Sequence, residues 1–294
     1  MIFCGKIILV TGGTSGIGLT TSINFVKQGA EKVYVCGRSR LKWDIAKVLI
    51  NKELGDLENK IVYIQTDIRV ESQVKKMIRE IFHKHNQLDI CVNNAGVNTT
   101  PRNLWDVDFG TTEINGDTIK FEFYSGSEED KQSTLFTNLY GLIFCLKWEI
   151  KYMLKYNNRS KPVSIVNIAS SISSIGTITW PDYAASKAGV VSLTKSVAGQ
   201  VALLYKNDKY NTPRIYINSI SPGFTLTPLF LQSLGHGNIE EKINQLKNLI
   251  PLNRLGTPNE ISNAILLFAN YKNVIYITSN DLSVDGGLTN LPNF

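Results

Sequence analysis

The sequence is poor in the residues that build metal sites and disulfide frameworks. It has four cysteines and three histidines among 294 residues. The cysteines are Cys4, Cys36, Cys91 and Cys145. Each lies in an apolar segment and none forms a C-x-x-C pair, so we expect buried free thiols in a reducing, cytoplasmic compartment. His83, His85 and His236 have no cysteine or carboxylate cluster at ligand spacing, and the sequence predicts no metal.

Long apolar runs and clustered charge are also missing. No run of 18 or more apolar residues occurs, so no membrane-spanning helix is expected. The first residues enter a strand and a glycine loop directly, which leaves no room for a signal peptide. The net charge is +6 and the pI about 9.0, but the lysines are scattered, which argues against a nucleic-acid or membrane partner. With no repeat or linker, we expect one domain over residues 1–294.

A glycine-rich loop follows the first apolar run of the chain. Residues 7–10 (IILV) have the composition of a parallel strand buried on both faces, and TGGTSGIG (residues 11–18) leads from it into a helix over about 17–28. We expect Gly12 to form the tight turn, Gly16 to let backbone approach a phosphate, and Gly18 to allow close helix packing. The helix would direct its first N–H groups at a pyrophosphate. The alternative is a glycine turn without a ligand.

The end of the next strand bears on cofactor choice. Sites that prefer NAD place an Asp or Glu here, on the ribose 2′-hydroxyl. This chain has Gly37, Arg38, Ser39 and Arg40 after the strand at residues 32–36. No carboxylate is present to repel a 2′-phosphate and Arg38 can pair with one, so we predict NADP(H). If Arg38 instead stacks on adenine, NAD(H) is equally possible.

A tyrosine and a lysine four residues apart suggest acid–base chemistry. Tyr183 and Lys187 lie in an alanine-rich stretch that favours a helix, where positions i and i+4 share a face. A phenol has a pKa of roughly 10, and a neighbouring cation lowers it toward the working range. Tyr183 would then exchange a proton with a substrate oxygen that Ser170 also contacts. The alternative is a half-buried tyrosine beside a solvated lysine.

Seven short motifs in a fixed order resemble the short-chain dehydrogenase/reductase family. They are TGGTSGIG, NNAG (residues 93–96), Asn138, Ser170, YAASK (residues 183–187), SPG (residues 221–223) and VDGG (residues 284–287). Ser170 stands thirteen residues before Tyr183, as in the family, and the resemblance runs from about Lys6 to Thr289. It implies a carbonyl reductase-like enzyme with the catalytic residues Asn138, Ser170, Tyr183 and Lys187.

The resemblance also implies the residues that hold the cofactor. Asp67 would contact adenine. The alternative role of that segment is to cap the following helix, through Asp67 or Ser72. The turn at residues 94–96 would line the adenosine ribose, and Thr225 and Thr227 would contact the nicotinamide amide or phosphate. The full set is Gly12, Thr14, Ser15, Gly16, Ile17, Gly18, Arg38, Ser39, Asp67, Ile68, Asn94, Ala95, Gly96, Tyr183, Lys187, Pro222, Gly223, Thr225 and Thr227.

Two segments are expected to shape the substrate end. Residues 99–133 resemble an insertion, and a turn at Asn115-Gly116 before the alternating IKFEFY predicts a small hairpin beside the active-site mouth, or else an inert surface decoration. Residues 228–251 resemble the family's substrate lid, with Leu229, Phe230 and Leu234 facing the substrate or packing on the protein itself. Trp180 and Ile178 are expected to line the pocket.

The alternation of strands and helices predicts an α/β fold: a Rossmann-type, doubly wound parallel sheet of about seven strands with helices on both faces. The expected activity is hydride transfer between NADP(H) and a carbonyl or secondary alcohol in a small-molecule substrate (EC 1.1.1.-). The resemblance implies a homo-oligomer, a dimer or tetramer. The alternatives are an NAD-dependent alcohol or steroid dehydrogenase and a catalytically silent nucleotide-binding scaffold.

Overall fold

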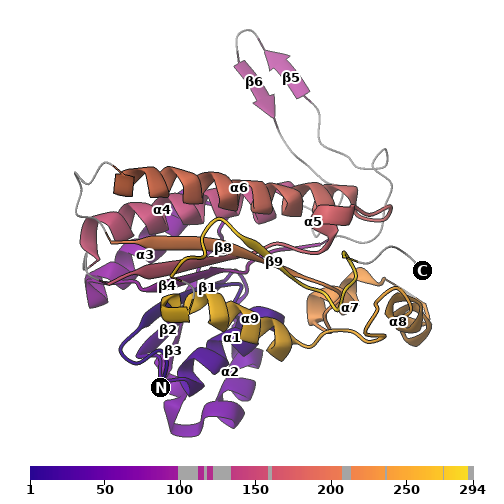
Figure 1. The fold of residues 1–294 in the computed structure, drawn as a ribbon, viewed down its shortest axis with the longest axis horizontal. Helices are drawn as coiled ribbons and strands as arrows, with labels where there is room; N and C mark the ends of the chain where they lie inside the picture. Colours follow the sequence, from indigo (N-terminus) through magenta and orange to yellow (C-terminus); the bar gives the residue numbers. More distant parts are fainter. Residues whose placement is uncertain are drawn as a thin grey trace.

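A computed structural model shows a central sheet with helices on both faces (Figure 1). The structure describes residues 1–98, 112–115, 118–121, 134–157, 161–206, 213–235, 237–273 and 275–290.

Seven parallel strands form the sheet, in the order β3-β2-β1-β4-β7-β8-β9. Their bounds are β1 Ile7–Thr11, β2 Lys32–Gly37, β3 Ile61–Gln65, β4 Ile90–Asn93, β7 Val163–Ile168, β8 Ile215–Pro222 and β9 Asp281–Val284. From β1 the strands are added outward through β2 to β3, and from β4 they are added in the opposite direction across the sheet. A doubly wound sheet opens its ligand crevice at this switch point between β1 and β4. The predicted fold class is confirmed.

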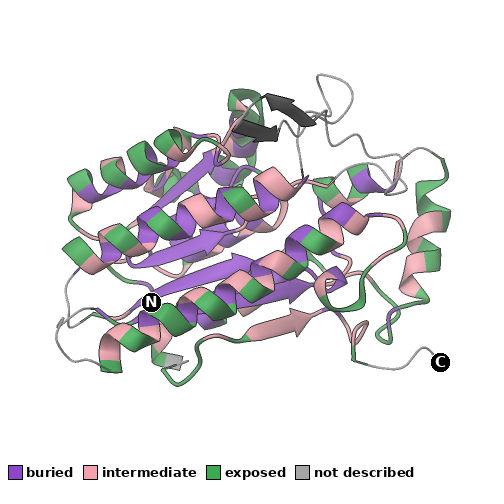
Figure 2. Ribbon diagram, turned by 90° about the horizontal axis from the view of Figure 1, so that it is seen from above, coloured by how far each residue is buried: buried purple, intermediate pink, exposed green. Residues whose placement is uncertain are grey.

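Three long helices cover each face of the sheet. One face carries α1 Gly16–Lys27, α2 Arg40–Leu54 and α9 Pro258–Ala269, and the other carries α3 Glu71–His85, α4 Gly141–Tyr156 and α6 Pro181–Lys206. The shorter helices are η1 Gly55–Lys60, η3 Phe136–Tyr140, α5 Ile172–Ile175, α7 Pro228–Ser233, α8 Ile239–Lys247 and η4 Tyr271–Asn273. The outer faces of the long helices are largely exposed, whereas the central strands are buried (Figure 2).

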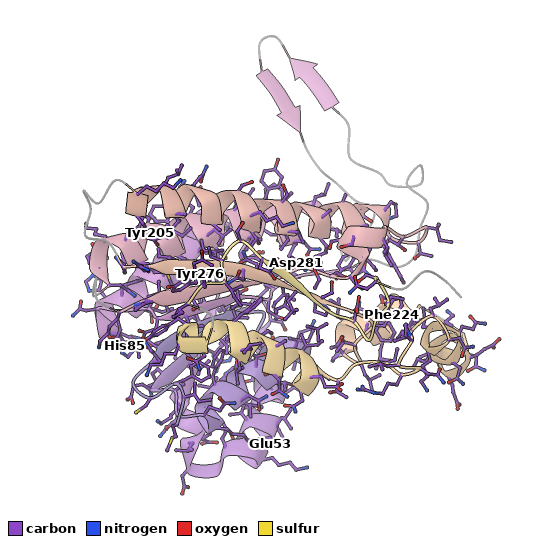
Figure 3. All side chains as sticks on the ribbon, viewed as in Figure 1. Glu53, His85, Tyr205, Phe224, Tyr276 and Asp281 are labelled. Atoms are coloured by element: carbon purple, nitrogen blue, oxygen red, sulfur yellow. The ribbon has the colours of Figure 1, made fainter. Side chains whose placement is uncertain are left out.

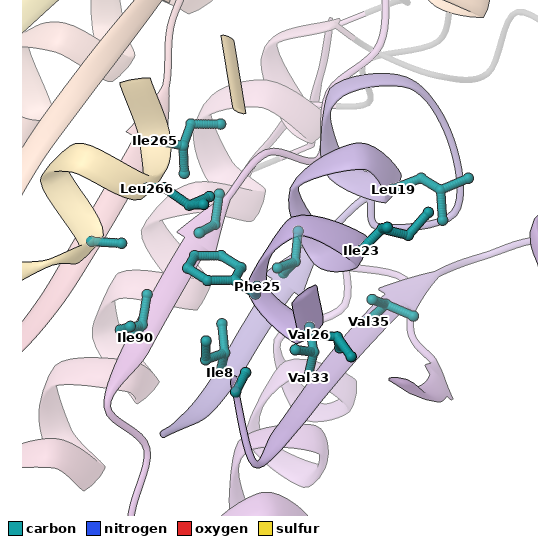
Figure 4. Packing of buried hydrophobic residues seen from close by; sticks show 14 of the residues in the cluster. Ile8, Leu19, Ile23, Phe25, Val26, Val33, Val35, Ile90, Ile265 and Leu266 are labelled. Carbon is teal, nitrogen blue, oxygen red and sulfur yellow. The ribbon is translucent and has the colours of Figure 1, made fainter. Parts of the chain in front are cut away.

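The alternation of side chains along β1 builds two cores. Ile8 and Val10 point into the cluster under α1, α2 and α9, while Ile7 and Leu9 point into the cluster under α3, α4 and α6. Figure 4 shows Phe25 of α1 among Ile8 and residues of α9. Phe25 has no exposed surface, and burying such a side chain contributes about 1.5–3 kcal/mol.

Helix ends are fixed by local polar contacts. Thr257 and Glu260 form a reciprocal capping box at the start of α9, with Pro258 in the first turn, as its place in the sequence suggests. One helical segment has two parts: η3 is a π-helical turn that contains Asn138, and α4 follows it directly. Such turns are rare and concentrate at functional sites.

The predicted hairpin is present. β5 (Thr112–Asn115) pairs antiparallel with β6 (Thr118–Phe121), with Asn115 opposite Thr118 across the expected turn. The remainder of the insertion at 99–133, including its flanks, lies outside the described residues.

The structure bears on two expectations from the sequence, the burial of the cysteines and the absence of a membrane-spanning helix. Cys4, which forms an isolated β-bridge with Ala30, is exposed, so the expectation of a buried thiol is wrong there; the other three cysteines are buried and free. Among the described residues, one helix, α6, has the length and apolar composition of a membrane span, and 22% of that window is buried. Its buried residues pack against the sheet beside β8 and it carries Tyr183 and Lys187, so we interpret it as a helix that covers the sheet.

Candidate active site

Two adjoining cavities open at the carboxyl ends of the parallel strands. The larger, of about 310 Å³, lies over the ends of β1, β2 and β4. The smaller, of about 130 Å³, lies over the ends of β7 and β8 and beneath α7. Figure 3 places Phe224 at this end of the sheet, beside α7, with His85 and Tyr205 at the opposite end. Ligands of open α/β sheets bind at this carboxyl edge.

The sequence-predicted cofactor residues gather around these two cavities, with one exception. The larger cavity is lined by Gly12, Thr14, Ser15, Gly16, Ile17, Arg38, Ser39, Asp67, Ile68, Asn94, Ala95, Gly96 and Thr227. The smaller is lined by Tyr183, Lys187, Pro222, Gly223 and Thr225, together with Ile17, Asn94, Gly96 and Thr227. Gly18 lines neither cavity, because it packs underneath the loop.

The glycine loop has the geometry of a phosphate cradle. Gly12 and Gly16 have positive φ angles, 65° and 52°, which side-chain-bearing residues rarely adopt. A Cβ on Gly18 would stand 2.5 Å from the Gly12 carbonyl oxygen, so the close packing expected of Gly18 is confirmed. Gly12 and Gly16 line the larger cavity at the start of α1 and present backbone there, so the loop fits a dinucleotide pyrophosphate.

Charged side chains line the larger cavity beyond the ends of β2 and β3. Arg38 lines it at the end of β2, and Asp67 faces it from the end of β3. Arg69 holds the Asp67 carboxylate through two oxygens, with contacts of 2.6 to 3.1 Å. Burial alone would raise the pKa of Asp67, but the Arg69 hydrogen bonds outweigh it and the pKa is lowered. The helix-capping alternative is wrong for both Asp67 and Ser72, because Val70 occupies the N-cap of α3 without a side-chain bond.

The turn after β4 forms the floor between the cavities. Asn94 Nδ2 donates to the carbonyl oxygens of Thr11 (3.1 Å) and Gly12 (3.2 Å). The backbone N–H groups of Asn94 and Ala95 both donate to Thr11 Oγ1 at 3.1 Å. These contacts fasten the glycine loop to the neighbouring strand.

Ser170 and Tyr183 meet at the smaller cavity. Ser170 follows β7 and is 8% exposed, and Tyr183 stands on the first turn of α6; both line the smaller cavity. This places a hydroxyl and a phenol on the same wall of the pocket. Both can reach one substrate oxygen, as the spacing of thirteen residues suggested.

Lys187 and Asn138 complete the group. Lys187 is 4% exposed, its Nζ donates to the Ile168 carbonyl oxygen at 2.8 Å, and it lies 5.7 Å from the Tyr183 ring centroid. Asn138 pairs with both backbone groups of Val97, at 2.8 and 3.0 Å, and donates to Ser186 Oγ. A Cβ on Gly96 would stand 3.2 Å from Asn138 Oδ1 and 3.4 Å from Lys187 Nζ, so the three positions converge.

The proton affinities in this structure differ from the sequence expectation for the phenol. Burial raises the pKa of Tyr183 to about 12, and the nearby Ser170 hydroxyl offsets only part of that rise. Burial lowers the pKa of Lys187 to about 8. The ammonium is engaged with the Ile168 carbonyl rather than with the phenol, so in this state removal from water outweighs attraction between the two groups.

The loops after β8 form one wall of the smaller cavity. Ser171 N donates to the Pro222 carbonyl oxygen at 2.9 Å, which ties the ends of β7 and β8 together. Thr225 Oγ1 donates to the Gly223 carbonyl oxygen at 2.9 Å, and the Thr227 side chain caps α7 through Phe230 N. Both threonines are buried within the wall of the pocket.

One part of the smaller cavity is mainly apolar. Trp180, Ile172, Phe224, Leu229 and Phe230 line it. Trp180, Leu229 and Phe230 are therefore at the cavity, where they can contact a ligand. Ile178 is 96% exposed and points to solvent, so its assignment to the pocket was wrong, and Leu234 is buried without lining the cavity.

Sequence reasoning missed several lining residues. Lys42 lines the larger cavity next to Arg38 and Ser39, and its backbone N–H donates to the Ser39 side chain at the start of α2. The sequence signal for Lys42 was a lysine in the first turn of the helix that follows Arg38 and Ser39. Gln232 and Thr137 also reach this cavity, from α7 and η3, and neither segment carried a motif that marked them.

Comparison with known proteins agrees with this geometry. A family profile described as short chain dehydrogenase matches residues 6–235. The chain is 33% identical to a 3-oxoacyl-[acyl-carrier-protein] reductase, FabG, of Chlamydia pneumoniae, and the match covers 97% of each chain. A FabG of Thermotoga maritima is 30% identical over 97% of this chain and 98% of its own.

Solved structures share the fold over the whole chain. The ligand-free aldohexose dehydrogenase of Thermoplasma acidophilum superposes with a TM-score of 0.75 at 28% identity, covering 99% of this chain and 96% of its own. A 3-ketoacyl-(acyl-carrier-protein) reductase of Brucella melitensis, solved with NADH, gives a TM-score of 0.76 at 23% identity, covering 98% and 100%.

Proposed function

Because the chain belongs to the short-chain dehydrogenase/reductase family, an oxidoreductase family that interconverts carbonyls and alcohols with NAD(P)H, we propose that it is an NADP(H)-dependent carbonyl reductase for an apolar substrate. The observation that carries the proposal is the convergence of Ser170, Tyr183, Lys187 and Asn138 beside a cradle for a dinucleotide. The apolar lining of the smaller cavity supports a substrate with a hydrocarbon surface around its carbonyl.

The proposed mechanism assigns one role to each residue. A bound nicotinamide cofactor would supply or accept the hydride. Ser170 holds the substrate oxygen and Tyr183 gives it a proton during reduction. Lys187, with a pKa lowered to about 8, can pass a proton toward Tyr183 near neutral pH. Asn138 keeps the end of this route in place through its paired contacts with Val97.

The preference for NADP(H) rests on charge at the adenine end. Arg38 and Lys42 line the cavity there, and the nearby Asp67 carboxylate is already neutralised by Arg69. A 2′-phosphate would therefore meet two cations and no free carboxylate. NAD(H) is the alternative, which the NADH complex of the Brucella melitensis protein keeps open.

Replacing Tyr183 by Phe tests the mechanism. The variant keeps its ring in the pocket but has no proton to give, so we expect turnover of ketones and aldehydes to fall at least 100-fold. NADPH binding, followed by nicotinamide fluorescence, should remain. Tyr276→Phe is the matched control, because that side chain is fully exposed. Activity retained in Tyr183→Phe would overturn the assignment, and tight NADPH binding without any turnover by the unmodified protein would favour the silent scaffold.

A second candidate is reduction of a 3-oxoacyl group on a carrier. The relatives named as 3-oxoacyl-[acyl-carrier-protein] reductases match 97% of the chain. Comparing turnover of 3-oxoacyl thioesters, free or on a carrier protein, with turnover of simple apolar ketones separates the two. A strong preference for the carrier-bound thioester would replace the first candidate.

Organisation and assembly form part of the proposal. We propose a single cytoplasmic domain over residues 1–294, with an insertion at 99–133 and a lid at 228–251 that comprises α7 and α8. The protein would form a dimer or tetramer, which the exposed outer faces of α4 and α6 support, with Tyr140, Tyr156 and Leu203 partly exposed. A purely monomeric mass by light scattering would contradict this assembly.

A further inference from the structure

A carboxyl group is buried behind the active site, outside the machinery described above. Glu149 of α4 has no exposed surface. It lies four residues after Cys145 and four before Met153, both also buried, so it belongs to the helix face that packs on the sheet. Among the described residues, no Lys, Arg or His forms an ion pair with it. A buried charge without a cation is strongly unfavourable.

Glu149 stands at one end of a series of hydrogen-bonded side chains that spans three further elements. Asn93 Nδ2, at the end of β4, donates to Glu149 Oε2 and to Asn167 Oδ1, both at 3.0 Å. Asn167 Nδ2, on β7, donates to Thr194 Oγ1 of α6 at 2.9 Å. Asn93 and Asn167 are direct register partners in the sheet. This hydrogen-bonded series therefore connects α4, β4, β7 and α6 in the interior.

Two oxygens of this hydrogen-bonded series have no hydrogen-bond donor among the residues that the structure describes. They are Glu149 Oε1 and Asn93 Oδ1, both shielded from solvent. Both are acceptors when Glu149 is ionised, so the charged form leaves two buried acceptors unsatisfied, each costing about 1–3 kcal/mol. A proton on Oε1 would turn the carboxyl group into a donor. A neutral acid and an amide can then pair side by side through two hydrogen bonds.

We propose that Glu149 is a positioning residue that works as a neutral carboxylic acid, shares its proton with Asn93, and loses this pairing when it ionises. The titratable groups that face it are the thiols of Cys91 on β4, Cys145 on α4 and Cys36 on β2, and none of them supplies a positive charge. Burial raises the pKa of Glu149 to about 7, and the Asn93 amide and the nearby Cys91 thiol offset only part of that rise.

The series of hydrogen bonds is linked to the reacting groups through the residues that follow Asn93 and Asn167 in the sequence. Asn93 precedes Asn94, whose side chain holds the glycine loop. Asn167 precedes Ile168, whose carbonyl oxygen accepts the Lys187 hydrogen bond. Ionisation of Glu149 would loosen Asn93 and Asn167, and with them the positions of Lys187 and the cofactor loop. Glu149 thus acts on the reaction through others and touches no substrate.

Glu149→Gln separates the neutral role from a charged one. Glutamine has the same shape and carries an N–H where the acid carries an O–H, so it can pair with Asn93 at any pH. We expect wild type and variant to have equal kcat near pH 6. One pH unit above the Glu149 pKa, the variant should exceed wild type by up to about tenfold, because about a tenth of the wild type remains neutral. Taking the ratio of the two proteins cancels the titration of Tyr183 and Lys187, which both share.

Infrared spectroscopy gives a readout that needs no substrate. The wild-type minus Glu149→Gln difference spectrum should show the carbonyl stretch of a protonated acid at pH 6, and this band should weaken above neutrality. Glu58→Gln, in an exposed position, should show no such band. The kinetic arm rests on the proposed function, whereas the infrared arm does not, so a protein without turnover would still give a result. Absence of the band at pH 6, or a Glu149→Gln variant impaired at every pH, would overturn the proposal.

Discussion

Replacing Lys187 by Met should stabilise the cofactor-free protein while removing its activity. The ammonium is buried in the folded state, where its pKa falls to about 8, compared with about 10.4 for an exposed lysine. That difference is a penalty of about 3 kcal/mol on the charged folded form. Methionine fills a similar volume without the charge, but it leaves the Ile168 carbonyl oxygen without its partner, at about 1 kcal/mol. The net expectation at pH 7 is a gain of about 2 kcal/mol.

The pH dependence of this gain tests the reasoning. Below about pH 8 the lysine is charged in both states, so the folded protein bears the full penalty. Between about 8 and 10.4 the folded form releases its proton first, and stability of the wild type rises with pH. The advantage of Lys187→Met should therefore shrink to about zero near pH 10.

Urea unfolding midpoints of both proteins, measured from pH 7 to pH 10, give this difference directly. Lys195→Met is the matched control, because Lys195 is exposed on the same helix and should change stability by no more than about 0.5 kcal/mol. A Lys187→Met variant that is destabilised at pH 7, or whose difference from wild type does not vary with pH, would refute the buried-charge argument.

Two further variants test the cofactor cradle. Arg38→Ala should raise the Kd of NADPH by roughly 10- to 100-fold and leave that of NADH nearly unchanged, since it removes a charge-assisted contact with the 2′-phosphate; equal losses for both cofactors in fluorescence titrations would point to adenine stacking instead. Gly18→Ala should destabilise the protein by about 1–3 kcal/mol, because its Cβ would stand 2.4 Å from Asn94 Nδ2. Gly199→Ala, whose Cβ meets nothing within 4 Å, is its control, and an unchanged thermal midpoint for Gly18→Ala would contradict the packing role.

The fold was predictable because its strands carry strong and redundant signals. A run such as residues 7–10 is apolar on both faces, and β1, β2, β4, β8 and β9 each end within three residues of a glycine. The hairpin at 112–121 was found for a similar reason, since an Asn-Gly turn and alternating residues act within a few positions of each other. Local signals of this kind do not depend on distant packing.

The site was predictable in its residues and less so in its electrostatics. Motif spacing located Ser170, Tyr183 and Lys187, but the direction of the Tyr183 pKa depends on how much water the surrounding chain removes, which no spacing encodes. Ile178 failed because the loop after β7 turns its side chain outward. Glu149 was missed because its neighbours in sequence, Lys147 and Lys151, suggest a solvated helix face.

The signal for Glu149 was nevertheless in the sequence. Leu142, Cys145, Glu149 and Met153 recur at intervals of three and four, the period of one helix face. A charged residue at an apolar position of such a pattern means either that the buried helix face has been assigned wrongly or that the residue has a function. Only the packed structure distinguishes the two.

The π-helical turn at Phe136–Tyr140 has a consequence for how this chain aligns with others. Each residue of an α-helix advances its side chain by about 100°, and a π-turn accommodates one residue more than the regular spiral would hold. The faces before and after Asn138 are therefore out of phase by about that angle. A relative lacking a single residue in this segment would regain an unbroken spiral, and the asparagine that aligns with Asn138 would then leave the Val97 backbone. Alignments through this turn should be judged by the phase of α4 rather than by matching the asparagine itself.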